Sequence, residues 1–409
     1  MSAFERREAL FAEREPQVRA FLPEEGRFER LRREFAELEA RWSDPENRPP
    51  LFGVPFGVKD IFHADGFETR AGSRLPPEVL RGPEAPSVTA LKRAGALILG
   101  KTVSTEFAYF APGPTRNPRN PEHTPGGSSS GSAAAVAAGL CPLALGTQTI
   151  GSILRPAAFC GVVGFKPTRG RISTDGVIPL APTFDHVGFF TRNAHDARIV
   201  AGLLLDEPPW DLTERRPRLG IPEGPYLSRV SAEGKAHFDA VCNRLAIAGY
   251  TIKIVPALEN FDDIVERHYR VLAAEMARVH ESWFARYEEL YHPRTAELIR
   301  KGQGISDAEL ERERSGGERL LDELTSLMDR HRFDLWISPP ALGPAPRGLD
   351  STGDPVMNLP WTQAGMPALC IPAGKSADGL PMGLQIAGGL GDDEDVLSWG
   401  IDLESVLQS

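Results

Sequence analysis

The segment from Pro125 to Pro167 limits the possible folds of this chain more than any other. It reads PGGSSSGSAAAVAAGLCPLALGTQTIGSILRPAAFCGVVGFKP, in which two turns rich in Ser and Gly enclose a helix of small residues and a short apolar strand. Ser152 in the second turn follows Ser128 in the first by 24 positions. The run GGSSSGS has only seven residues and leads directly into the predicted helix, which disfavours a flexible linker. The segment therefore predicts two serine-bearing turns on a compact scaffold.

A second interpretation of the first turn is a nucleophile elbow. Gly127, Ser129 and Gly131 match the pattern G-x-S-x-G, which requires a strand immediately before it. The preceding residues, TRNPRNPEHTPG, are rich in Pro and Asn and cannot form a central strand. The elbow is therefore disfavoured.

Short apolar runs alternate with helical patterns along most of the chain. GVPFGVKDIF and GALILGKT are typical of buried strands, and PSVTALKRAGA is typical of a helix between such strands. Similar runs return at 217–256 and from Phe333 onward. Strands that alternate with helices predict an α/β fold with a mostly parallel sheet covered by helices on both sides. We expect the C-terminal strands to rejoin this sheet.

Composition divides the chain into an N-terminal part, 1–50, and a main domain, 51–409. The first 42 residues are rich in Arg and Glu and predict two amphipathic helices, broken near Pro23, that pack on the core. Within the main domain, the region of about 206–330 predicts a variable, charged helical section. In that section ERERSGGER, at 311–319, predicts a loop.

Charge and composition exclude several classes of partner. The net charge of −10 disfavours nucleic acid and anionic membranes as main partners. The charged N-terminus lacks the apolar region of a secretory signal, and the most apolar stretch, 133–145, is too short to cross a bilayer. The four cysteines lie far apart and form no metal-binding pattern. We therefore expect a cytoplasmic protein without a metal or cofactor.

Several segments together resemble the amidase-signature family. The paired turns GGSS and GTQTIGS carry the resemblance, as do GVPFGVKD, KTVSTEFA, FCGVVGFKPTRGR, GMPALCIPAG and GLPMGLQIAG, which cover most of the chain from residue 51 onward. The resemblance implies an α/β/α sandwich with a large mixed, mostly parallel twisted sheet covered by helices, and a Ser–cis-Ser–Lys triad. By motif position Ser152 is the nucleophile, Ser128 the proton relay and Lys59 the base, and the implied cis peptide joins Gly127 to Ser128.

The residue types agree with these roles. A serine hydroxyl is a weak nucleophile until a positioned base removes its proton. Lys59 lies in an apolar segment, and burial lowers the pKa of a lysine towards values at which its neutral amine acts as a base. The Ser128 hydroxyl both donates and accepts hydrogen bonds, as a relay must. Ser129 is a candidate for a supporting hydrogen bond, and we expect Ser130 to cap the following helix.

The turn before the second serine is expected to supply backbone N–H groups to an oxyanion, a role that the resemblance assigns to Thr149, Ile150, Gly151 and Ser152. The family commonly has Gly-Gly-Ser here, whereas this chain has Ile-Gly-Ser. A β-branched residue resists positive φ. The turn must therefore manage with one flexible position fewer, or Ile150 must point into the pocket.

Two further departures involve Gln148 and Leu154, which stand where family members commonly have Asp and Arg. Arg155 follows the nucleophile by three places, and the pattern G-T-Q-T-x-G-S-x-x-R-P resembles the malonamidase-like branch, in which the matching Arg grips a substrate carboxylate. A guanidinium suits this task because it forms two parallel charge-assisted hydrogen bonds. The alternative, that Arg155 only ties down the loop, stays open.

Weaker candidates surround these residues. The residues that we expect to bind substrate are Arg155, Ser129, Gly127, Tyr109 and Gln148. Aromatic residues at 109, 110 and 361 are candidates for a pocket wall, although aromatic side chains more often belong to the core. Structural roles are favoured for Asp60, Glu106, Asn117, Asp185 and His186.

These features predict an amidohydrolase that cleaves a small-molecule amide through an acyl-enzyme. The same groups could attack a carbamate, ureide or ester. A second alternative is the glutaminase component of a tRNA-dependent amidotransferase, against which the departures at Gln148 and Leu154 count. A homodimer is expected if the N-terminal helices leave an apolar face uncovered.

Overall fold

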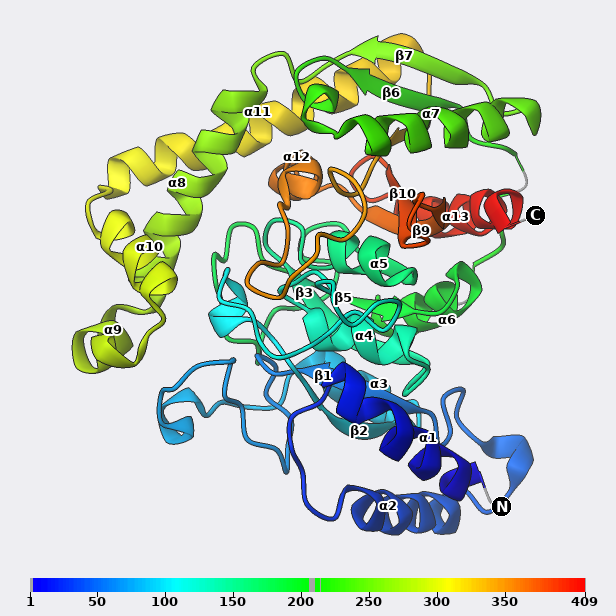
Figure 1. The fold of residues 1–409 in the computed structure, drawn as a ribbon, viewed down its shortest axis with the longest axis vertical. Helices are drawn as coiled ribbons and strands as arrows, with labels where there is room; N and C mark the ends of the chain where they lie inside the picture. Colours follow the sequence, from blue (N-terminus) through cyan, green and yellow to red (C-terminus); the bar gives the residue numbers. More distant parts are fainter. Residues whose placement is uncertain (1–2, 206–209, 214, 409) are drawn as a thin grey trace.

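The computed structural model describes residues 3–205, 210–213 and 215–408. Two N-terminal helices, α1 (Ala3–Val18) and α2 (Arg27–Arg41), lie together at one end of the molecule beside β2 (Leu97–Thr102), as predicted (Figure 1). Their apolar faces are covered, because Phe11 packs edge-on against Phe28 and Phe4 against Phe35. No large hydrophobic side chain of α1 or α2 is exposed among the described residues. The apolar face expected to drive a homodimer is therefore absent from these helices.

A ten-stranded sheet forms the centre of the described chain, in the order β2-β1-β3-β5-β4-β9-β10-β8-β6-β7. The C-terminal strands β9 and β10 lie in its middle, so they do rejoin the sheet. The strands other than β2 are β1 (Pro55–Lys59), β3 (Leu143–Gln148), β4 (Val163–Lys166), β5 (His186–Thr191), β6 (Leu219–Glu223), β7 (Ile252–Pro256), β8 (Leu335–Ser338), β9 (Ala368–Lys375) and β10 (Pro381–Ala387).

The sheet is mixed, as predicted, but parallel pairs are not the majority. Four of the nine pairings between these strands are parallel, and they lie towards the two edges. The five central pairings are antiparallel. Two connections explain the difference. The helix α5 (Leu154–Cys160) links β3 to β4, but β5 follows an irregular segment and inserts between them in the opposite direction, and β9 and β10 form a hairpin.

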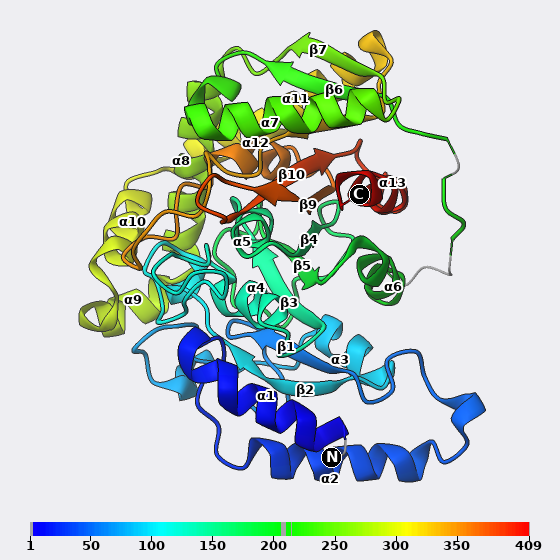
Figure 2. The same ribbon diagram turned by 45° about the vertical axis from the view of Figure 1, so that its right-hand side comes forward.

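Helices cover both faces of the sheet, which agrees with the expected α/β/α sandwich. Gly164 of β4 faces α5, because a Cβ there would meet Ala157 at 2.7 Å. Leu369 of β9 is paired with Phe165, the residue after Gly164, so its side chain lies on the opposite face of the sheet. There it contacts Gly400 of α13 (Asp393–Gln408). Figure 2 shows α4 and α5 apart from α6 and α13, with the sheet between them. The remaining helices of the sandwich are α3 (Pro86–Arg93), α4 (Ser130–Ala137), α6 (Ala194–Leu204) and α7 (Ala232–Ile247).

Helices α8 to α11 form a helical arm along one side of the molecule (Figure 1). They are α8 (Phe261–Val279), α9 (Glu281–Tyr287), α10 (Pro293–Gln303) and α11 (Asp307–His331). The arm falls within the predicted variable section, of which residues 206–209 and 214 lie outside the described residues. No helix of the described chain combines the length and apolar character that a membrane span needs.

The loop predicted at 311–319 is wrong, because α11 runs through it without a break. Its two glycines serve close packing instead of a turn. A Cβ at Gly316 would come within 2.2 Å of the Arg267 Nε on α8. A Cβ at Gly317 would lie 3.1 Å from the Gln363 carbonyl of α12 (Leu359–Gln363). Glycine therefore lets three helices approach one another.

Candidate active site

Lys59, at the end of β1, is fully buried beneath the two serine turns. Its Nζ lies 2.7 Å from Ser128 Oγ and 2.7 Å from Thr147 Oγ1. Burial holds the pKa of Lys59 well below its ordinary value, and the negative charge of Asp185 opposes this shift only in part. The site therefore contains a buried amine whose neutral form is favoured.

The first serine turn lies between the irregular segment after β2 and the helix α4. The Gly127–Ser128 peptide bond is cis. Ser128 itself is buried, with 3 % of its surface exposed. Its hydroxyl lies beside the amine of Lys59, which is the geometry that a relay to Lys59 requires.

The other residues of the first turn hold the backbone. Ser129 is fully buried, and its Oγ donates to the Thr147 carbonyl and accepts from the Thr147 N–H. It gives the expected supporting hydrogen bond, but it does not reach a substrate. Ser130 does not cap α4, since its Oγ donates to the Val103 carbonyl of a neighbouring segment. The predicted capping role of Ser130 is therefore wrong.

The second serine turn connects β3 to α5 and carries Ser152. Ser152 retains 8 % of its surface exposed, and its hydroxyl makes no hydrogen bond to another described residue. Neither Ile150 nor Gly151 has a positive φ. Ile150 is buried in the core, so the turn is formed without a second flexible residue. Glycine is needed at 151 for space, because a Cβ would lie 2.2 Å from Asn358 Oδ1.

Gln148 stabilises this turn from inside and does not line a pocket. It is fully buried, and its Oε1 accepts from the N–H groups of Ile153 and Leu154 at 2.9 and 3.0 Å. Its Nε2 donates to Thr362 Oγ1. Since every one of these bonds is internal, the prediction that Gln148 binds substrate is wrong.

Arg155 is also internal, with 1 % of its surface exposed. Its Nη1 donates to the Gly353 carbonyl at 2.6 Å, and its Nη2 donates to the Gly127 carbonyl at 2.6 Å and to Thr352 Oγ1 at 3.2 Å. Only the buried Nε has no partner among the described residues. Of the two alternatives, the geometry therefore favours the tie between loops. Gly127 is buried against Thr352 with its carbonyl occupied, so neither residue presents the substrate contact that was predicted.

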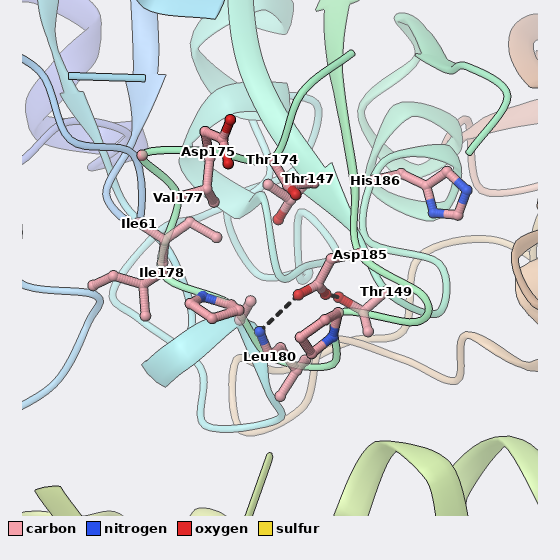
Figure 3. Close-up of a pocket in the computed structure, with 14 residues that line it drawn as sticks. Ile61, Thr147, Thr149, Thr174, Asp175, Val177, Ile178, Leu180, Asp185 and His186 are labelled. Carbon is pink, nitrogen blue, oxygen red and sulfur yellow. Dashed lines mark hydrogen bonds between the residues drawn. The ribbon is translucent and has the colours of Figure 1, made fainter. Parts of the chain in front are cut away.

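A pocket of about 330 Å³, whose lining residues Figure 3 shows, meets this cluster at Thr147; Lys59, Ser128 and Ser152 are not among its lining residues. Thr147 and Thr149 belong to its wall, and Thr147 is also the partner of Lys59. Asp185 accepts from Thr149 Oγ1 at 2.5 Å and from the Leu180 N–H at 2.9 Å, as the dashed lines show. Burial raises the pKa of Asp185. The rest of the wall is formed mainly by apolar residues, among them Ile61, Ala108, Val177, Ile178, Pro179 and Pro182.

A second pocket, of about 410 Å³, lies beyond the loop that Arg155 holds. Phe110 and Tyr269 form its aromatic side, and Arg294 and Asp354 are its charged residues. Tyr109 packs against Phe110 in a tilted arrangement, with ring centroids 4.6 Å apart, and is half-buried; burial raises its pKa to about 12. Tyr109 lies in the chain between Ala108 of the first pocket and Phe110 of the second, but it is not among the residues that line either one, so the predicted substrate contact is not supported.

The remaining candidates have structural roles. Trp361 is fully buried and donates to Tyr226 Oη, so it belongs to the core. Glu106 accepts from the N–H of His292 at the start of α10. Asp60 pairs with Lys101 at 3.1 Å. No group of three or more His, Cys, Asp or Glu residues in the described ranges could hold a metal ion.

Sequence reasoning missed three contributors to the site. They are Thr147, the second partner of Lys59, together with Thr362 and His268, which donate to the carbonyls of Ile150 and Thr149. Thr147 had a usable signal, since it lies in the strand that ends at the second serine turn. The other two come from more than a hundred residues further along the chain, and no local pattern marks them.

This fold and this cluster define an enzyme of the amide-hydrolase class. The chain belongs to the amidase family: the family model described as Amidase matches residues 25–397. Its members act on C–N bonds of amides. This match identifies the amidase family as a whole and does not distinguish the malonamidase-like branch from the others.

Individual relatives cover nearly the whole chain. The glutamyl-tRNA(Gln) amidotransferase A component from Koribacter versatilis (strain Ellin345) is 32% identical in an alignment of 406 positions that covers 86% of this chain and 84% of the relative. A crystal structure of an amidase is 32% identical, with a TM-score of 0.89 over 99% of this chain and 95% of that one. The peptide amidase from Stenotrophomonas maltophilia is 27% identical, with a TM-score of 0.81 over 100% of this chain and 93% of that chain.

Proposed function

We propose that this protein hydrolyses small, neutral amides through an acyl-enzyme on Ser152, with Ser128 as proton relay and Lys59 as base. The observation that carries the proposal is the position of Lys59 Nζ, fully buried and 2.7 Å from Ser128 Oγ. Because burial holds the pKa of this lysine well below its ordinary value, the neutral amine that can take a proton is favoured. A lysine on the surface could not serve in this way.

The reaction begins when Ser152 Oγ attacks the carbonyl carbon of the amide. Its proton passes to Ser128 Oγ, while Ser128 gives its own proton to the Lys59 amine. The tetrahedral intermediate collapses as the proton returns along the same path to the leaving nitrogen, and the C–N bond breaks. Water then repeats the sequence on the acyl-enzyme and regenerates Ser152.

The backbone N–H groups of Ile150, Gly151 and Ser152 are available to the oxyanion. None of them donates to another described residue, whereas the next two N–H groups along the chain are bound by Gln148. Donors that are already oriented stabilise developing charge without reorganisation. We include the Thr149 N–H in the proposed oxyanion hole on the same grounds.

Neutral substrates are favoured by the charges around the site. The wall of the pocket beside Lys59 includes Asp175 and Asp185, and no Lys or Arg belongs to it among the described residues. His186, also in this wall, is held neutral because burial keeps its pKa well below the ordinary value. Arg155 has its two Nη atoms engaged by loop carbonyls, which leaves no fork for a carboxylate. Carbamates, ureides and esters with neutral substituents present the same carbonyl chemistry.

A second candidate is the glutaminase component of an amidotransferase. The observation that favours it is the name of relatives such as the Koribacter protein, 84% of whose length is covered. Glutamine carries both a carboxylate and an ammonium group, and the pocket beside Lys59 offers no cation to the former among its described residues. In the second pocket Arg294 has the charge that a carboxylate requires, and Asp354 has the charge that an ammonium group requires. This candidate is therefore tested in the same experiment.

The test is product release by the purified chain from a matched substrate panel, followed by mass spectrometry. The panel contains malonamate, a neutral aliphatic amide of the same length, an aryl amide, an aryl carbamate and glutamine. Ser152→Ala is the blank. We expect the neutral amides to be cleaved at least about tenfold faster than malonamate, the difference that one repelled or unpaired charge worth ~1.4 kcal/mol would produce.

Other outcomes decide between the alternatives. Preference for malonamate would mean that Arg155 leaves its loop partners to bind the substrate. Preference for glutamine would favour the glutaminase component. Turnover by Ser152→Ala equal to that of the unaltered chain would refute Ser152 as the nucleophile.

A further inference from the structure

His268 reaches the second serine turn from α8 of the helical arm. It is fully buried, and its ring stacks on Phe184 with centroids 4.0 Å apart and planes at 10°. Its Nε2 lies 3.0 Å from the Thr149 carbonyl oxygen. A carbonyl oxygen can only accept, so Nε2 carries the proton and donates. Burial lowers the pKa of this histidine to about 3, which makes the ring neutral at physiological pH.

The bond from His268 fixes the direction of a peptide group. The cis bond at Gly127–Ser128 is in the first turn, and the peptide between Thr149 and Ile150 is trans. In a trans peptide the carbonyl and the following N–H point in opposite directions. Since the Thr149 carbonyl points at His268, the Ile150 N–H points away from it.

The two following carbonyls of the turn are held in the same manner. Thr362 Oγ1 accepts from Gln148 and lies 2.7 Å from the Ile150 carbonyl and 3.1 Å from the Asn358 carbonyl, so its one proton is directed mainly at the nearer acceptor, Ile150. The Gly151 carbonyl accepts from the Arg155 N–H at 3.1 Å. Three consecutive carbonyls are thus held by donors, and within the described chain the three N–H groups behind them are left unbound.

We infer that His268 is a positioning residue, which orients the Ile150 N–H towards the oxyanion by holding the Thr149 carbonyl. The inference rests on the proposed function, because it assumes that Ser152 forms a tetrahedral intermediate beside this turn. It adds that the helical arm, which contributes no nucleophile or base, supplies part of the preorganisation of the site. The stacked Phe184 ring keeps the imidazole from turning.

The experiment compares His268→Phe, which keeps the aromatic stack but has no donor, with His268→Gln, whose amide N–H extends to about the place of Nε2. His237→Phe is the matched control. His237 lies on another helix, α7, and its Nε2 is likewise 3.1 Å from a backbone carbonyl oxygen, that of Ala373. For each variant kcat and KM are measured on the best neutral amide. The inhibition constant of benzyl trifluoromethyl ketone, which forms a tetrahedral adduct with a serine, is measured as well.

We expect His268→Phe to lower kcat by roughly 10- to 100-fold, less than the 100- to 1,000-fold loss of a whole oxyanion donor. KM should change less than about threefold, since a ground-state carbonyl depends little on this donor. Binding of the ketone should weaken by the same factor as kcat/KM. His268→Gln should recover most of the loss, and His237→Phe should have no effect on kcat.

Three results would overturn the inference: an unchanged kcat in His268→Phe, a change in KM alone, or an equal loss in His237→Phe. If His268→Phe does not fold, His268→Gln and the shorter His268→Asn take its place, and equal kcat in these two would overturn it. Ser152→Ala is measured alongside. An active Ser152→Ala refutes the proposed function, whereas an inactive Ser152→Ala beside an unaffected His268→Phe refutes only the positioning role.

Discussion

Thr147→Val removes one of the two hydrogen-bond partners of Lys59 with almost no change in side-chain volume. Thr147 Oγ1 lies 2.7 Å from the Nζ of the fully buried Lys59, and valine offers this amine no acceptor in its place. The bond strengthens when the amine takes up its proton, because a charged donor forms the stronger hydrogen bond. An unpaired buried donor costs about 1–3 kcal/mol. At about 1.36 kcal/mol for each factor of ten, kcat/KM should fall by roughly 5- to 160-fold.

The assay is the pH dependence of kcat/KM. Thr147 stabilises the protonated lysine more than the neutral one, so its removal lowers the pKa of Lys59 further. The rising limb of the profile should therefore move to lower pH while the plateau falls. Thr191→Val is the control, since Thr191 is equally buried at the opposite end of the β3–β5 pair and donates to the Asn193 carbonyl. A plateau within twofold of the unaltered chain, or a limb moved to higher pH, would refute this role of Thr147.

Three further predictions concern the same site. Gln148→Leu leaves the buried N–H groups of Ile153 and Leu154 without an acceptor. The free energy of unfolding, measured by denaturant titration, should fall by ~2–6 kcal/mol. A loss below about 1 kcal/mol would contradict the role of Gln148 in stabilising the turn. Gly151→Ala places a Cβ within 2.2 Å of Asn358 Oδ1, so kcat should fall on the order of 100-fold, and normal kinetics would show that the turn can yield. Because the pKa of Lys59 is lower in the folded than in the unfolded chain, folding at a pH below the unfolded pKa releases a proton. This release costs free energy, and the cost grows as the pH falls. Lys59→Met should therefore raise the free energy of unfolding more at pH 6 than at pH 9, and an equal change at both would contradict a neutral lysine.

The elements of the sandwich were largely predictable from the sequence because their patterns are local. Apolar runs such as GVPFGVKDIF and PALCIPAG each form a strand of the sheet. The glycines of α11 show where local reasoning fails. Gly316 looks like a helix breaker, yet its role depends on Arg267 of another helix, which no window along the chain contains.

The candidate site divides in the same way. Lys59 and Ser128 were found through motifs, and the structure places their side chains together. The substrate-binding roles predicted for Gln148 and Arg155 were wrong or unsupported, since a polar side chain after a strand looks alike whether it faces a cavity or the interior. What decides is the set of loop carbonyls and N–H groups around it. For Arg155 that set includes Gly353 and Thr352, almost two hundred residues further along the chain, as well as Gly127.

The strand order has a consequence for synthesis on the ribosome. The edge of β4 is covered by β9, which begins about 200 residues after β4 ends. At 5–20 residues per second, that edge waits roughly 10–40 s for its partner strand. An open edge offers unpaired N–H and carbonyl groups to any other chain. The nascent chain therefore has a period in which it depends on chaperones or on dilution, and truncation before residue 368 would make this exposure permanent.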